Sequence, residues 1–217
     1  MASTTTPVPA DDPAKEAAAE AGGEGAKKTA AEAETPAPLP PLSPREFREY
    51  NHLADQMNAY HNHFRHTWTM LYTACTENRR PQGMSLRQFI DQGLYFVRGL
   101  TMHHNIEETY FFPQLAKRMP EFQAGKGKGK GGGKGGGGGM AELLQQHRQI
   151  HAGMDVFEEY LTQCRRGERE LEMATLKAKM DSWGDVLWTH LDQEVKTLGA
   201  ENMRKYWTKE EIFALTP

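Results

Sequence analysis

Apolar residues recur with the spacing of an α-helix along four stretches of this chain. In each stretch, large apolar side chains return every three or four residues, as they do on one face of a helix. Capping boxes at Ser43 and Ser85 mark two of the helix starts. The four stretches cover approximately residues 44–78, 86–119, 140–164 and 170–198. Because no alternating run indicates a strand, the pattern predicts an all-α fold, an up-down-up-down antiparallel four-helix bundle.

Two segments differ from the helical stretches in composition. Residues 1–43 are rich in Ala, Glu, Pro, Thr, Lys and Gly and contain no aromatic residue, so we expect a disordered tail. Residues 125–139 read GKGKGKGGGKGGGGG, which predicts a flexible linker between the second and third helices. The folded domain is then expected over 44–207, with a short helix or tail over 208–217.

Charge and cysteine content narrow the possible partners and location. The formal net charge of −3 gives no reason to expect a nucleic-acid partner. No apolar run approaches the roughly 18 residues of a membrane span, and no signal peptide is evident. Cys75 and Cys164 lie far apart in the sequence and do not form a disulfide framework. We therefore expect a protein of the reducing cytoplasm.

Histidine and carboxylate residues interrupt three of the apolar stripes in pairs. Four residues make a little over one helical turn, so the members of each pair share a helix face. Ionisable groups that face an apolar core need partners, and a metal ion would provide one. The three pairs are His103 with Glu107, His147 with His151, and His190 with Glu194. Together they predict a buried metal site.

The first helix is expected to add one more imidazole. His61 shares the inward face of Phe64 and Trp68, whereas His63 points away from the centre of that face. We therefore favour His61 as the ligand and keep His63 as the alternative.

The second helix offers two registers. His104 with Glu108 is an alternative to His103 with Glu107, but it fits the apolar stripe less well. The favoured register forms one continuous row of Phe96, Leu100, His103, Glu107 and Phe111.

Five imidazoles and two carboxylates exceed the needs of one tetrahedral zinc ion. Seven protein ligands match two metal ions that share both carboxylates. A nitrogen-rich set without thiolates suits iron, zinc, copper or nickel better than calcium or magnesium.

Three segments resemble one family in residue identity as well as in spacing. They are HHNIEETYFFPQL at 103–115, HRQIH at 147–151 and HLDQE at 190–194. Together they resemble the hemerythrin-like family, or HHE cation-binding domain, in its fungal form. The resemblance covers roughly residues 44–207.

The resemblance implies a four-helix bundle with two non-haem iron ions joined by an oxo or hydroxo bridge, although other metals such as zinc are compatible. In that scheme His61 and His103 would hold the iron with an open position. The second iron would be held by His147, His151 and His190, with Glu107 and Glu194 bridging. The spacing His190-x3-Glu194 departs from the invertebrate oxygen carriers and matches the iron-sensing domain of a eukaryotic ubiquitin ligase.

The leading hypothesis is a di-iron protein that binds dioxygen or responds to iron and oxygen, rather than an enzyme. One alternative is a peroxidase or oxidase that removes peroxide or nitric oxide at the same centre. Another is an interaction module that the metal merely stabilises. The expected small partner is dioxygen, a similar diatomic molecule or a peroxide.

Overall fold

The computed structural model describes residues 39–123 and 139–215. The predicted tail over 1–43 lies outside the described residues except for its last five positions. The predicted linker over 125–139 also lies outside them, apart from Gly139. Neither prediction is tested by the structure.

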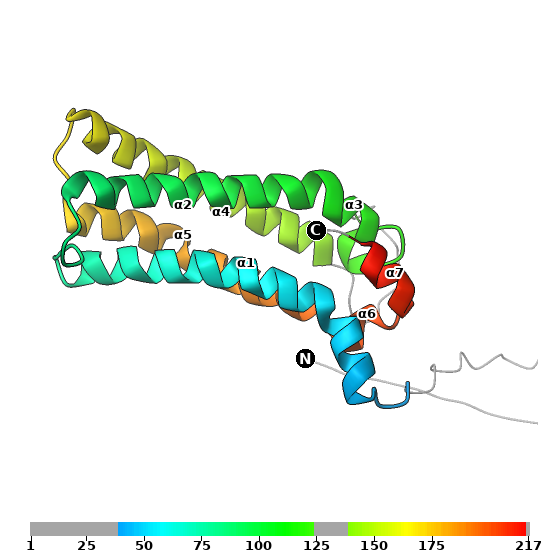
Figure 1. Cartoon of the computed structure of the whole chain (residues 1–217). Coiled ribbons are helices and arrows are strands. Elements are labelled where there is room, and N and C mark those ends of the chain that lie inside the picture. The colour runs from blue at the N-terminus through cyan, green and yellow to red at the C-terminus, as the bar shows by residue number, and fades with distance from the viewer. Residues whose placement is uncertain (1–38, 124–138, 216–217) are drawn as a thin grey trace, which may run out of the picture. The chain divides into compact units, whose positions relative to one another are not determined.

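Four long helices build the domain (Figure 1). They are α1 (Pro44–Thr76), α2 (Leu86–Ile106), α4 (Gly139–Arg166) and α5 (Met173–Thr197). Contacts join α1 to α2, α2 to α4, α4 to α5, and α5 back to α1, which closes a ring around one interior. The predicted all-α, up-down-up-down bundle is therefore confirmed. Within residues 39–123 and 139–215, no helix is long and apolar enough to span a bilayer.

Local sequence signals fix where several helices begin and turn. Ser43, Ser85 and Thr208 each form a complete capping box, at the starts of α1, α2 and α7 (Lys209–Ala214). The short helix α7 agrees with the prediction for residues 208–217. After α4, Gly167 adopts φ 75°, the left-handed conformation that commonly ends a helix.

The second helix is less regular than its stripe predicts. The α-helix ends at Ile106 and passes into the π-helical segment η1 (Glu107–Phe111), followed by α3 (Phe112–Leu115). The cause is Pro113, which lacks an N–H and whose ring displaces the carbonyl four residues before it. The Phe112 N–H donates to the carbonyl of Glu107, five residues back. The expected helix is thus continuous only to Leu115 and includes a π-helical turn, instead of running as a regular α-helix to residue 119. A 3₁₀ turn, η2 (Pro120–Phe122), follows.

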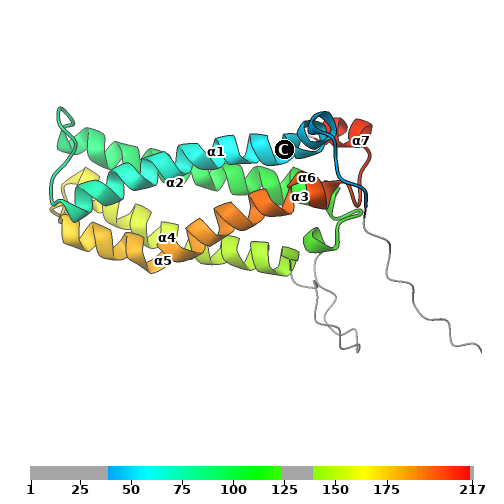
Figure 2. The same ribbon diagram turned by 90° about the horizontal axis from the view of Figure 1, so that it is seen from below.

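Two apolar clusters fill the interior. The first, here called the loop-end core, includes Trp68, Phe96 and Trp183 and lies toward the α1–α2 and α4–α5 connections. The second, the cap-end core, includes Phe112 and Trp207. It lies where α3, α6 (Ala200–Met203) and α7 close the other end of the bundle (Figure 2).

One glycine sets how closely α4 and α5 approach. A Cβ at Gly153 would overlap Cγ and Cβ of Trp183, which is 2 % exposed. Gly153→Ala should therefore destabilise the fold by about 1–3 kcal/mol through overpacking, even though alanine favours helices by about 1 kcal/mol. Urea denaturation would measure this change.

Gly99→Ala is the matched control, because a Cβ there would meet Phe64 Cε1 at an ordinary 3.5 Å. It should leave the unfolding midpoint unchanged or raise it. Equal stability of the Gly153 and Gly99 variants would contradict the close contact at Trp183.

Candidate metal centre

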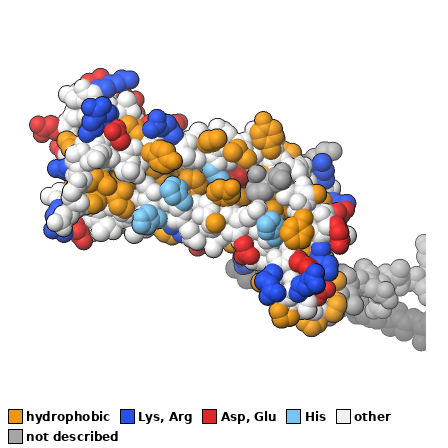
Figure 3. Space-filling model, viewed as in Figure 1, with side chains coloured by type: hydrophobic (Ala, Val, Ile, Leu, Met, Phe, Trp, Pro, Cys, Tyr) orange, Lys and Arg blue, Asp and Glu red, His pale blue; other side chains and the backbone are white. Residues whose placement is uncertain are grey.

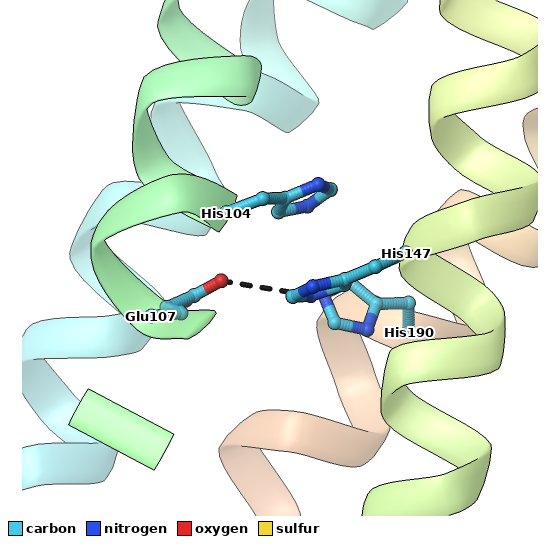
Figure 4. Close-up of side chains that lie close together, drawn as sticks. All are labelled: His104, Glu107, His147 and His190. Atoms are coloured by element: carbon cyan, nitrogen blue, oxygen red, sulfur yellow. Dashed lines mark hydrogen bonds and ion pairs between the residues drawn. The ribbon is translucent and has the colours of Figure 1, made fainter. Parts of the chain in front are cut away.

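Histidine and glutamate side chains from all four long helices meet inside the bundle, between the two apolar cores. Their ligand atoms form two groups, in each of which all atoms lie within 4.8 Å of one another. The first group is His61, His103, Glu107 and Glu194; the second is His104, Glu107, His147 and His190. Figure 4 shows the second group, with side chains from α2, α4 and α5 and from the start of η1 directed at one another. Glu107 belongs to both groups.

The two carboxylates lie between the groups. Glu107 Oε1 is 2.9 Å from His103 Nε2, and Glu107 Oε2 is 3.6 Å from His147 Nε2. Glu194 Oε2 is 3.3 Å from His61 Nε2 and 3.6 Å from His190 Nε2. Each carboxylate therefore faces imidazoles of both groups, as a ligand shared by two cations would.

These carboxylates are buried without hydrogen bonds. Glu107 and Glu194 are 1 % and 0 % exposed, and all four of their oxygens lack a hydrogen-bond partner. The buried Nε2 of His104 also lacks one. Leaving such groups unsatisfied costs about 1–3 kcal/mol each, and more when they are charged. A pair of cations would satisfy all five atoms, so the donor set fits a metal centre.

Outer partners orient two of the imidazoles. His61 Nδ1 lies 3.0 Å from the Leu191 carbonyl, and His147 Nδ1 lies 2.7 Å from Glu108 Oε1. Because both oxygens only accept, each Nδ1–H must donate, and each Nε2 then turns its lone pair toward the carboxylates. This is the usual way in which a protein fixes a metal-binding histidine.

A similar arrangement holds the remaining buried histidines. His190 Nδ1 lies 3.3 Å from Gln146 Oε1, and the Gln146 amide is in turn oriented by donating to Gln193 Oε1 at 2.8 Å. His104 Nδ1 lies 3.4 Å from Nε2 of His151, so His151 contacts the back of the His104 ring.

Burial favours the neutral form of four imidazoles, those of His103, His104, His147 and His190. It lowers the pKa of His103 to about 4 and that of His190 to about 3, in spite of the nearby Glu194 carboxylate. It also lowers the pKa of His104 and His147. Neutral imidazoles are the form that binds metal ions.

The two carboxylates differ in their preference for a proton. Burial, reinforced by the neighbouring Glu194 carboxylate, raises the pKa of Glu107 well above its usual value. Burial also acts to raise the pKa of Glu194, but the imidazoles around it, His61 and His190 first, prevail and lower it to about 2. Of the two carboxylates, Glu107 is therefore the one whose surroundings favour the protonated form, and a bound cation would compete with that proton.

The metal-free protein should lose stability as the pH falls from 7 toward 4. The folded pKa values of His103 and His190 lie below the unfolded value of about 6.5, so the unfolded chain binds more protons in this range. Each such imidazole removes about 1.4 kcal/mol per pH unit below pH 6.5. The raised pKa of Glu107 acts in the opposite direction, because the folded protein holds this proton more tightly than the unfolded chain does.

Urea midpoints at several pH values, taken without metal, would measure this slope. His104→Gln should flatten it, whereas a change at the exposed His66 should not. A midpoint that rises on acidification would contradict neutral, buried imidazoles.

The residues expected from the sequence fall into two sets. His61, His103, Glu107, His147, His190 and Glu194 lie in the two groups. His151 does not, and neither do the alternatives His63, which is exposed on α1, and Glu108, which contacts the back of His147. His104 was expected only as a substitute for His103. In the structure His103 lies in the first group and His104 lies in the second.

The sequence of two adjacent histidines followed three residues later by a glutamate indicates why His103 and His104 lie in different groups on either side of Glu107. Successive helical residues are rotated by about 100°, so the residue four after His103 and three after His104 lies at about 40°, between them. The sequence His-His-x-x-Glu therefore directs both imidazoles to either side of one carboxylate. Treating the two histidines as alternatives missed this.

A comparison of the sequence with known protein families matches the segment that carries the His/Glu cluster. A family model described as the hemerythrin HHE cation binding domain matches residues 52–200. This range contains every residue of the two groups.

One curated relative is a dimeric xanthone biosynthesis cluster protein R11 from Cryptosporiopsis sp. (strain 8999). It is 26 % identical over 167 residues, which cover 73 % of this chain. The matched region spans 56 % of that relative's length. No solved structure gives a significant match.

Proposed function

Because this chain belongs to the hemerythrin family of HHE cation-binding domains, we propose that its His/Glu cluster binds two iron ions. His61 and His103 would hold one ion, and His104, His147 and His190 the other. Glu107 and Glu194 would be shared. The observation that carries the proposal is the set of four buried carboxylate oxygens, none of them hydrogen-bonded, between five imidazoles.

The donor set favours iron over harder cations. Five imidazole donors and no thiolate suit Fe, Zn, Cu or Ni rather than Ca or Mg. When bound, two ferrous ions would supply an open coordination position and the electrons for a reaction with dioxygen. The chain's own contribution is to favour the neutral form of four imidazoles by burial, to orient His61 and His147 through their Nδ1 partners, and to exclude bulk water from the carboxylates.

We therefore propose a non-haem di-iron protein that binds dioxygen or responds to iron and oxygen. The His61 and His103 side is the accessible one: the His103 side chain is 11 % exposed, whereas His104, His147 and His190 are fully buried. A small molecule would approach the centre from this side.

Metal analysis with an optical spectrum tests the proposal directly. Protein loaded with ferrous iron without oxygen should contain two iron ions per chain. Admitting air should produce a charge-transfer band in the near-ultraviolet or visible range. If the protein binds far fewer than two ions per chain when loaded with iron, and again when loaded separately with zinc, the two-ion centre is refuted. Two ions without a spectral response to dioxygen would refute the oxygen-dependent role only.

An oxidase or peroxidase reaction is the second candidate. It gains support from the access to His103 and from the relative whose name places it in a xanthone biosynthesis cluster. Sustained consumption of peroxide over many turnovers, compared with one stoichiometric oxidation, would favour an enzyme over a binding protein.

A further inference from the structure

A cavity of about 260 Å³ opens between α1 and α2 and ends at the candidate metal centre. Its inner end is formed by His103 and Glu107, the two residues of α2 and η1 that face the first group. None of the other cavities described in the structure is lined by a residue of either group. The cavity therefore offers an approach to the centre from the side of His103.

The walls of the cavity are apolar and rich in sulfur and aromatic rings. Met57 and Phe64 line it from the buried side, at 1 % and 6 % exposed. Tyr60 and Met102 form its outer edge, at 56 % and 67 % exposed. On the face of the domain shown in Figure 3, hydrophobic side chains lie beside histidines over α1 and α2. The cavity walls contain no lysine or arginine to pair with an anion, and apart from His103 and Glu107 at the inner end they are largely apolar, so the site favours an uncharged ligand.

The volume exceeds what dioxygen needs. A water-sized molecule occupies about 30 Å³, and an apolar cavity of about 150 Å³ accommodates benzene. A space of about 260 Å³ would thus hold an aromatic ring with substituents. Thioethers and aromatic edges make favourable contacts with such a ring. The ring centroids of Phe64 and Tyr60 lie 5.2 and 5.9 Å from the ring centroid of His103. Both rings would therefore flank a ligand bound beside the centre.

We propose that this cavity binds a small, neutral aromatic molecule of the phenol class, with its hydroxyl directed toward His103 and Glu107. This deepens the proposed function, because it names the organic ligand class that the centre would meet, and it rests on that function for the metal at the inner end. Aromatic binding itself requires only the apolar walls. The two proposals can therefore fail separately.

Gly99 provides the test variant. It lines the cavity, and a Cβ there would point toward the ring of Phe64. Gly99→Leu should fill the space and weaken phenol binding at least tenfold, with the metal content unchanged. Gly99→Ala adds only one methyl group, at an ordinary contact distance, so it should weaken phenol binding less than Gly99→Leu does, again with the metal content unchanged.

The experiment titrates phenol into the zinc-loaded full-length protein, since zinc prevents oxidation of the probe. Calorimetry gives the affinity, and methyl NMR of the methionines locates the site. Met57 and Met102 should shift, whereas Met180 in the loop-end core should not. If Gly99→Leu fails to fold, the pattern of methyl shifts still decides the matter.

Two outcomes would overturn the inference. One is a protein with two zinc ions per chain in which millimolar phenol moves neither Met57 nor Met102. The other is unchanged phenol affinity in a folded Gly99→Leu variant. Phenol binding in a protein with far fewer than two metal ions would refute the proposed function and leave the aromatic site intact.

Discussion

Glu107→Gln should lose most of its bound metal, falling from two ions per chain to well below one. Glu107 is the residue shared by the two groups, and its oxygens face His103 on one side and His147 on the other. An amide lacks the negative charge that both ions would share. We expect affinity to fall by more than the roughly 10–100-fold typical of losing an outer-shell partner. Equilibrium dialysis with metal analysis would measure it.

The same variant carries an internal check on folding. Because burial disfavours the charged form of Glu107, a glutamine of equal size should leave the metal-free protein as stable as the parent, or more stable. Glu108→Gln is the matched control. Its amide oxygen can still accept from His147 Nδ1, so both ions should remain. Two ions per chain in Glu107→Gln would refute the shared role of Glu107.

His104→Ala and His151→Ala should separate a ligand from its supporting partner. His104 lies fully buried in the second group, whereas His151 contacts only its outer nitrogen, at 3.4 Å. His104→Ala should retain about one of the two ions. His151→Ala should retain both, with affinity reduced about 10–100-fold, as is usual when an outer-shell partner is removed.

Metal counts and dissociation constants for the two variants, measured side by side, would decide the assignment. If His151→Ala loses an ion and His104→Ala keeps both, the register expected from the His147-x3-His151 spacing would be restored, and His104 would be an outer partner. Equal losses would place both imidazoles on one ion.

Helix positions were largely predictable from the sequence because apolar spacing and caps agree with each other. The capping boxes at Ser43 and Ser85 start α1 and α2 where the stripes begin. The exception is the second helix, whose apolar stripe continues past Pro113. The stripe reports which side chains are buried, but it does not report the missing N–H that converts the helix at Glu107 to a π-helical turn.

The metal candidates were predictable in kind but not in full detail. Six of the seven residues favoured from spacing lie in the two groups. Spacing places His147 and His151 on one face of α4, but one helical turn also moves a side chain about 5–6 Å along the axis. Depth along the bundle depends on how neighbouring helices are staggered. A single stripe does not contain that information, so spacing alone does not indicate that His104, and not His151, lies in the second group.

The position of the His/Glu cluster between two separate apolar cores has a consequence for cooperativity. Carboxylates and imidazoles contribute little cohesion across the middle of the bundle unless cations hold them together. We therefore expect the loaded protein to melt as one unit. The metal-free protein should unfold locally first at the cap-end core, where α6 and α7 close the bundle, while Trp68 and Trp183 of the loop-end core stay packed. Amide hydrogen exchange should then show two levels of protection, one for each core, that become equal when metal is added. The ions would thus couple the unfolding of the two ends of the bundle.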